Sequence, residues 1–144
     1  MPLRWFGRST ATAPVNSTPA THIDKGQERF GLEIVGESHY QDALRRSLKS
    51  ASDSHGRKVV RVLVQREPTN AFDPDAIRIS HPTHGLLGYL SRGEAKRYTS
   101  HIARFEAAGL TVTCTAMLAG GSRDKPSIGA WLNLPWPTKA NWTL

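Results

Sequence analysis

Hydrophobic and polar residues alternate along several short stretches of the 144-residue chain. In the stretch 29–36, Phe30, Leu32 and Ile34 fall on one face, and the stretch 58–66 is rich in valine, a residue favoured in strands. Such alternation predicts strands with one buried face. We expect six strands, at residues 29–36, 58–66, 75–80, 86–90, 110–119 and 128–134.

Two further stretches carry apolar residues at helical spacing and predict helices over 37–51 and 91–108. Ser38 is expected to cap the first helix and Ser91 the second, each followed three residues later by a Gln or Glu that completes a capping box. Gly109 follows the second helix at the position where a glycine commonly ends one.

The order of these elements indicates the fold class. Short strands without a regular strand–helix–strand alternation predict a mainly β domain with two helices, built as a small, partly open antiparallel barrel. We expect this domain to span residues 27–135. Residues 1–26 are rich in Thr, Ser, Ala and Pro and predict a disordered tail, and residues 136–144 read as a Pro- and Trp-rich C-terminal tail.

The charge balance narrows the class of partner. The chain carries a formal net charge of +7 with a pI of about 10.1. A basic protein of this size attracts nucleic acid or another polyanion, although a solvated basic surface without such a partner is the alternative.

Metal and redox chemistry have little support in the sequence. The single cysteine, Cys114, lies in an alternating run, so we expect a buried strand residue in a reducing, cytoplasmic protein. His81 and His84 share a turn, but no cysteine or carboxylate cluster accompanies them, and no metal site or cofactor is expected.

Catalytic and membrane signatures are also missing from the sequence. It contains no phosphate-binding glycine loop, no zinc-protease motif and no serine at a nucleophile elbow. No stretch approaches the roughly 20 apolar residues that cross a membrane. We therefore expect a protein that is not an enzyme and has no membrane partner.

The stretch EPTNAFDPDAIRI, residues 67–79, joins two predicted strands and raises the main question about function. Asn and Asp favour turns, and Pro74 biases Asp73 toward extended backbone, so a simple turn is one reading. Phe72 either plugs the end of the barrel or faces a ligand together with Asn70 and Asp73.

Four stretches together resemble the HIRAN domain family: FGLEIVGESHYQDALRR, VVRVLVQREPTNAFDPDAIRI, GLLGYLSRGEAKRY and GAWLNLP. The resemblance covers roughly residues 29–135. It implies a barrel similar to the oligonucleotide-binding (OB) fold. In the best-understood member of the family, the domain holds the 3′ end of single-stranded DNA.

The resemblance also implies a set of site residues. Asn70, Phe72 and Asp73 match positions of the family's pocket for the DNA end, and Tyr89 and Arg92 match positions close to phosphate. In those roles Phe72 stacks on a base, Asp73 accepts a hydrogen bond from the 3′-hydroxyl, and Arg92 binds a phosphate.

Next to the first predicted helix the sequence departs from the family. Ser38 and His39 stand where the family has an Arg and a Tyr, and His39 and Tyr40 are the rings available there for stacking on DNA.

The sequence thus predicts a non-catalytic module that binds single-stranded DNA at its 3′ end, in DNA repair or at replication forks, with a helicase or nuclease as a further partner. An adaptor domain that binds a protein through the same pocket or the Trp-rich tail is the alternative. A nuclease or phosphatase acting on DNA ends is a third reading, for which the sequence shows no ligand set.

Overall fold

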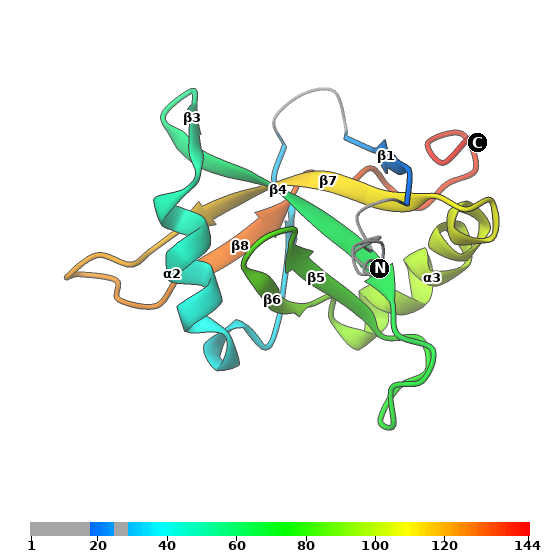
Figure 1. Cartoon of the computed structure of the whole chain (residues 1–144), viewed down its shortest axis with the longest axis horizontal. Coiled ribbons are helices and arrows are strands. Elements are labelled where there is room, and N and C mark those ends of the chain that lie inside the picture. The colour runs from blue at the N-terminus through cyan, green and yellow to red at the C-terminus, as the bar shows by residue number, and fades with distance from the viewer. Residues whose placement is uncertain (1–17, 25–28) are drawn as a thin grey trace, which may run out of the picture.

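The structure, a computed structural model, describes residues 18–24 and 29–144. This part of the chain forms one curled sheet, with two α-helices packed at its opposite ends (Figure 1). Six strands neighbour one another in the order β2-β8-β7-β4-β5-β6, and they pair antiparallel. Their bounds are β2 (Leu32–Glu33), β4 (Arg57–Arg66), β5 (Ile77–His81), β6 (Gly85–Tyr89), β7 (Thr111–Ala119) and β8 (Gly129–Leu132). The predicted fold class, a mainly β domain built as a small half-open barrel, is confirmed.

One short seam brings the two ends of this sheet together. Val35, just after β2, pairs with Tyr89 of β6: the Val35 N–H donates to the Tyr89 carbonyl at 2.7 Å, and the reverse bond is 2.9 Å. Gly88 permits this close approach, because a Cβ there would lie 2.7 Å from the Val35 carbonyl oxygen. The seam curls the sheet into a barrel and places Tyr89 at the point of closure.

The second helix forms as predicted. Helix α3 (Arg92–Ala107) is capped by Ser91, whose hydroxyl accepts a hydrogen bond from the Glu94 N–H at 3.3 Å. Gly109 follows the helix with a φ of 80°, a left-handed conformation that glycine adopts without strain.

The first helix is shorter than predicted, and its expected cap is wrong. A 3₁₀ turn, η2 (Glu37–His39), precedes helix α2 (Gln41–Lys49), and Ser38 lies within η2 instead of capping a helix. Gln41 makes long-range bonds in place of a capping box. Its amide donates to the Ile128 carbonyl at 3.0 Å and accepts from the Ile128 N–H at 2.9 Å. These bonds dock α2 on the segment that leads into β8.

The N-terminal boundary of the domain lies earlier than predicted. Strand β1 (Ala20–His22) pairs parallel with β7, although residues 1–26 are expected to form a tail. Residues 1–17 and 25–28 lie outside the described part. A three-residue strand carries too little hydrophobic pattern to be recognised in the sequence. The same applies to β3 (Ser52–Ser54), which extends β4 as a hairpin.

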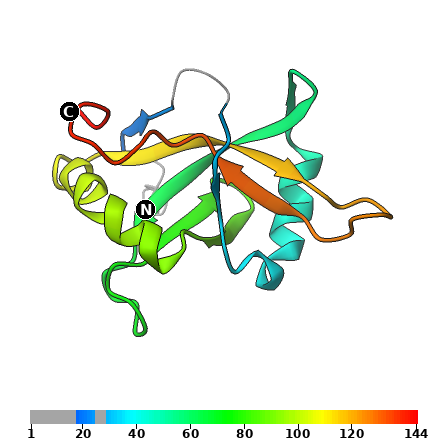
Figure 2. The ribbon, with the colours of Figure 1, turned by 180° about the vertical axis from the view of Figure 1, so that it is seen from behind.

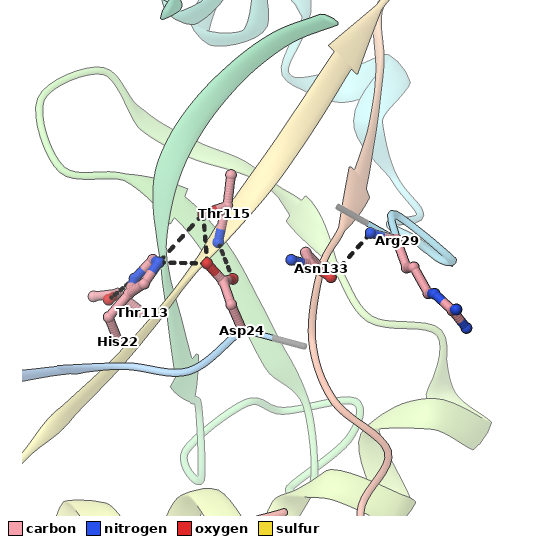
Figure 3. A network of polar contacts seen from close by, with 6 residues as sticks. All are labelled: His22, Asp24, Arg29, Thr113, Thr115 and Asn133. Atoms are coloured by element: carbon pink, nitrogen blue, oxygen red, sulfur yellow. Dashed lines mark hydrogen bonds and ion pairs between the residues drawn. The ribbon is translucent and has the colours of Figure 1, made fainter. Parts of the chain in front are cut away.

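A polar network fastens β1 to β7 (Figure 3). His22 Nε2 lies 2.8 Å from Asp24 Oδ2, and His22 Nδ1 lies 2.8 Å from the hydroxyl of Thr113. Thr115 donates to Asp24 through both its N–H and its hydroxyl, at 3.0 and 2.9 Å. Thr113, to which His22 is hydrogen-bonded, is almost fully buried. The His22–Asp24 pair therefore has a structural role: it holds β1 against β7.

The core lies between the concave side of the sheet and the two helices, and its composition corrects one expectation. Trp142, in the predicted C-terminal tail, is fully buried, and its ring packs edge-on against Tyr98 and Phe105 at 5.8 and 5.7 Å. Trp131, in β8, is only half-buried. Cys114 is fully buried as predicted, and burial raises the pKa of its thiol. Within the described ranges no helix is long and apolar enough to cross a membrane.

Candidate nucleic-acid interface

The loop between β4 and β5 projects beyond the sheet (Figure 2), and its shape is set by Asn70. The Asn70 side-chain oxygen accepts the backbone N–H groups of Phe72 and Asp73, at 2.9 and 3.0 Å. Its amide nitrogen donates to Glu67 at 3.0 Å. Bonds of this kind replace the backbone partners that a turn lacks. The Asn70 side chain therefore acts within the loop, and it holds the two residues that follow it in place.

The two carboxylate oxygens of Asp73 have different partners, one in the loop and the other on α3. Asp73 Oδ1 accepts the Asp75 N–H at 2.9 Å, and the Asp73 carbonyl accepts the Ala76 N–H at 3.0 Å. Asp73 Oδ2 lies 3.6 Å from Arg92 Nε. The turn reading and the ligand reading of this residue are therefore compatible, because the turn uses only one of the two carboxylate oxygens.

Phe72 does not plug the barrel. The residue is 89% exposed at the tip of the loop, so its ring lies outside the core. An exposed ring held by an ordered backbone is a surface on which a flat partner can stack.

Arg92, the first residue of α3, contacts the loop between β4 and β5. Its guanidinium donates to the Phe72 carbonyl at 3.3 Å and lies 3.6 Å from Asp73, while 72% of its side chain is exposed. The Asp73 side chain of this ion pair is only 19% exposed, so the pair is partly buried, while the exposed Arg92 guanidinium keeps further donors that can reach a phosphate. The positive end of the α3 dipole adds to the attraction for an anion.

Glu67 is the residue of this site that sequence reasoning missed. The Tyr89 hydroxyl lies 3.0 Å from each of its carboxylate oxygens, and Arg78 lies 3.5 Å from Oε2. Glu67 therefore connects the loop, through Asn70, with β5 and β6. Burial raises the pKa of Tyr89, and the hydrogen bond to Glu67 and its charge act in the same direction. The phenol is thus held in its neutral, donating form.

Five of the seven predicted site residues meet around one shallow pocket of about 220 Å³. Ala76 and Leu90 complete its lining. The polar groups lie at the rim, and the apolar side chains form the floor. The five residues from the sequence prediction are Asn70, Phe72, Asp73, Tyr89 and Arg92.

His39 and Tyr40 lie beside this pocket and not in it. They line a separate hollow of about 370 Å³ at the start of α2, with their rings edge-on at 6.2 Å. Turn η2 contacts β6, and Tyr40 is close enough to Tyr89 to influence its pKa. The structure thus divides the predicted residues between two adjacent hollows.

In residues 18–24 and 29–144, no three His, Cys, Asp or Glu side chains are grouped so that they could bind a metal ion. The His81 and His84 rings lie 4.4 Å apart, but His81 Nδ1 accepts the N–H groups of Thr83 and His84, so this pair shapes a turn.

Comparisons with protein-family models, with curated proteins and with solved structures gave no match. The HIRAN resemblance therefore stays a prediction from the sequence, and the function must be argued from the pocket itself.

Proposed function

We propose that this chain is a non-catalytic module that binds single-stranded DNA and holds its 3′-hydroxyl end, in DNA repair or at replication forks. One observation carries the proposal. An exposed aromatic ring, a carboxylate and an exposed guanidinium, from Phe72, Asp73 and Arg92, surround one pocket with an apolar floor. The resemblance to the HIRAN family supports the same class of ligand.

Each group matches one part of a terminal nucleotide. Phe72 offers a face on which any base can stack, a contact worth about 1–3 kcal/mol per base. Asp73 Oδ2 accepts a hydrogen bond from a free 3′-hydroxyl, and a charged acceptor makes this bond stronger than a neutral one. Arg92, 3.6 Å from Asp73, binds the phosphate on the 5′ side of the same nucleotide.

Asp73 also distinguishes an end from the interior of a strand. If the strand continued, its next phosphate would lie against the carboxylate. Two like charges about 4 Å apart repel by ~4 kcal/mol at an effective dielectric constant of 20. A terminal hydroxyl gains a hydrogen bond at the position where an internal phosphate is repelled.

The experiment compares oligonucleotides that differ only at the 3′ end. Fluorescence anisotropy with a 5′-labelled octathymidylate ending in a hydroxyl or in a phosphate measures the preference directly. Asp73→Asn keeps an oxygen that can accept the Asp75 N–H but removes the charge, so the turn survives. We expect wild type to prefer the hydroxyl end at least tenfold, and Asp73→Asn to lose this preference.

Asp75→Asn is the matched control, because Asp75 is an adjacent half-buried carboxylate that does not line the pocket. It should keep the preference. Equal binding of both ends by wild type would refute the proposal.

An adaptor role is the second candidate, and the exposed Phe72 over the apolar floor of Ala76 and Leu90 favours it. Peptide anchors use the same kind of surface as bases do. Wild-type protein that binds none of the oligonucleotides at low salt would favour this role, since electrostatic binding of nucleic acid is strongest there.

A further inference from the structure

A groove runs over the outer face of the sheet, on the side away from the core. Two hollows of about 510 and 370 Å³ lie there, and they share Arg61, His81 and Pro82 in their linings. Along β4 the residues that face the core alternate with residues that line the groove. The core-facing residues are Val60, Val62 and Val64, and Arg61, Leu63 and Gln65 line the groove.

The strand register connects this groove with the pocket at Phe72. Arg78 lines the groove, and it is paired directly across β5–β6 with Tyr89 and across β5–β4 with Gln65. Directly opposed residues project from the same face of a sheet. Tyr89, Arg78 and Gln65 therefore form one row that leads from the pocket into the groove.

The lining of the groove is cationic. Its charged side chains are Arg61 and Arg78, it also holds His22, His81 and several hydroxyl groups, and it contains no Asp or Glu. Two acids that contact residues of this lining are engaged in ion pairs. Glu67 pairs with Arg78 at 3.5 Å, and Asp24 with His22 at 2.8 Å.

The two arginines have donors to spare. Arg61 is exposed and has no acidic partner among the described residues. Arg78 Nε, although buried, has no hydrogen-bond partner in the same part of the chain. Guanidinium groups with unused donors, above a floor with no carboxylate, suit the phosphates of a nucleic-acid backbone.

We propose that this groove binds the nucleotides that precede the 3′-terminal one, so that the DNA strand runs from Phe72 past Tyr89 and Arg78 toward Arg61 and His22. The inference rests on the proposed function, which supplies the direction of the strand. From β6 to β4 the row crosses two strand spacings, about 10 Å, and Arg61 lies four residues from Gln65 along β4, about 13 Å farther. The whole site then takes about four nucleotides, near the lower limit of the range for OB folds.

The test measures affinity against length. Oligothymidylates of two, four, six and eight nucleotides, each with a 3′-hydroxyl, are titrated by fluorescence anisotropy against wild type, Arg61→Ser and Gln65→Glu. Arg123→Ser is the matched control, because Arg123 is an exposed arginine on the loop between β7 and β8, away from the groove. Thermal unfolding of every variant shows that the fold is intact.

We expect wild-type affinity to rise up to about four nucleotides and then to level off. Arg61→Ser should bind the eight-nucleotide oligomer about fivefold more weakly than wild type, which corresponds to the loss of one exposed charge pair. It should bind the dinucleotide with the same affinity as wild type. For this variant the slope of log affinity against log salt concentration should become shallower by about 0.7, because one phosphate contact is lost. Gln65→Glu, which places a carboxylate in the groove, should weaken the octamer as well.

Either of two results would overturn the inference: the octamer bound equally by Arg61→Ser and wild type, or weakened equally by Arg61→Ser and Arg123→Ser. Failure of the proposed function is seen separately. If the hydroxyl and phosphate ends bind alike while Arg61→Ser still weakens the octamer, the groove holds DNA and the end pocket does not select an end. No binding of any oligonucleotide refutes both.

Discussion

The Tyr89 hydroxyl donates a hydrogen bond to Glu67, 22 residues away in sequence, and lies 3.0 Å from each of its carboxylate oxygens. Glu67 also accepts from Asn70 at 3.0 Å. One half-buried carboxylate thus joins the loop that carries Phe72 and Asp73 to the strand that closes the barrel. The positions of the Phe72 and Asp73 side chains therefore depend on the hydrogen bond between Glu67 and Tyr89.

Glu67→Ala and Tyr89→Phe should each lower the free energy of unfolding by about 1–2 kcal/mol, because each leaves a half-buried polar group without its partner. The double variant should lose about 1 kcal/mol less than the sum, since both changes remove the same bond. Urea unfolding of the four proteins gives the values, and Glu33→Ala, at an exposed site on β2, is the control. Strictly additive losses would contradict the pairing.

Phe72→Ala should leave stability unchanged within about 0.5 kcal/mol, because the ring is 89% exposed. The same change should weaken binding of an octathymidylate by about 1–3 kcal/mol, the worth of one stacked base. Anisotropy titration measures this loss. Trp136→Ala removes another exposed aromatic ring, 61% accessible and outside the pocket, and should bind as wild type does. Equal loss in both variants would mean that the DNA contacts aromatic surface in general.

Gly88→Ala should destabilise the protein by about 1–3 kcal/mol, because the new Cβ would lie 2.7 Å from the Val35 carbonyl oxygen and 2.9 Å from the Ile34 side chain. Gly93→Ala, in the first turn of α3 with no atom within 4 Å of the new Cβ, should instead stabilise it by up to about 1 kcal/mol. Thermal melts of the two variants should therefore shift in opposite directions. A neutral Gly88→Ala would show that the seam at Val35 is loose.

Trp142→Ala should cost about 3–5 kcal/mol, the usual effect of emptying a buried aromatic site. The ring is fully buried against Tyr98 and Phe105, and its N–H donates to the Trp136 carbonyl at 3.1 Å. Leu144→Ala, at a position 61% exposed two residues later, should cost less than about 0.5 kcal/mol. The denaturant midpoints of Trp142→Ala and Leu144→Ala test this difference. Similar midpoints for the two variants would mean that residues 136–144 do not contribute to the core.

Tyr98 predicts how stability responds to alkaline pH. Burial raises its pKa from 10 to about 12. Below pH 10 both the folded and the unfolded protein keep the phenol proton, so its contribution to stability is complete. Between pH 10 and about 12 the unfolded state releases this proton first, and stability should fall by up to about 1.4 kcal/mol per pH unit.

In Tyr98→Phe this part of the decline should disappear. Unfolding midpoints measured from pH 9 to 12 in both proteins test it, and identical slopes would show that other groups control alkaline unfolding.

The sequence predicted most of the β framework because its strands carry a clear alternating pattern, as β4 and β7 show. It also located α3, where Ser91 makes a local capping bond with the Glu94 N–H that can be recognised from spacing alone. Ser38 carries the same local signal and does not cap a helix. Gln41 is bonded to Ile128, 87 residues away, and a contact of that range leaves no trace in a local pattern.

Core membership at the chain end was missed for the same reason. Trp142 stands in a stretch without any period, and it is buried because α3 offers Tyr98 and Phe105 at the right place. Only the tertiary arrangement of α3 against the C-terminal segment reveals this.

In the candidate site, the sequence identified residues that cluster in one loop and at one helix start. Phe72 and Asp73 stood out in the loop between two predicted strands, and the HIRAN resemblance added Arg92. Glu67 was missed although it begins the same quoted stretch, because its partners Tyr89 and Arg78 come from other strands. The available signal was an acidic residue at the end of a Val-rich strand in a basic protein.

The seam between Val35 and Tyr89 divides the pocket into a part that can change and a part that cannot. The side chains of Phe72 and Arg92 are mostly exposed, so substitution there alters the ligand surface and leaves folding intact. Tyr89 contributes its side chain to the pocket and its backbone to the closure of the barrel. Relatives of this chain that acquire new ligands should therefore vary at the rim and retain the residue at the seam.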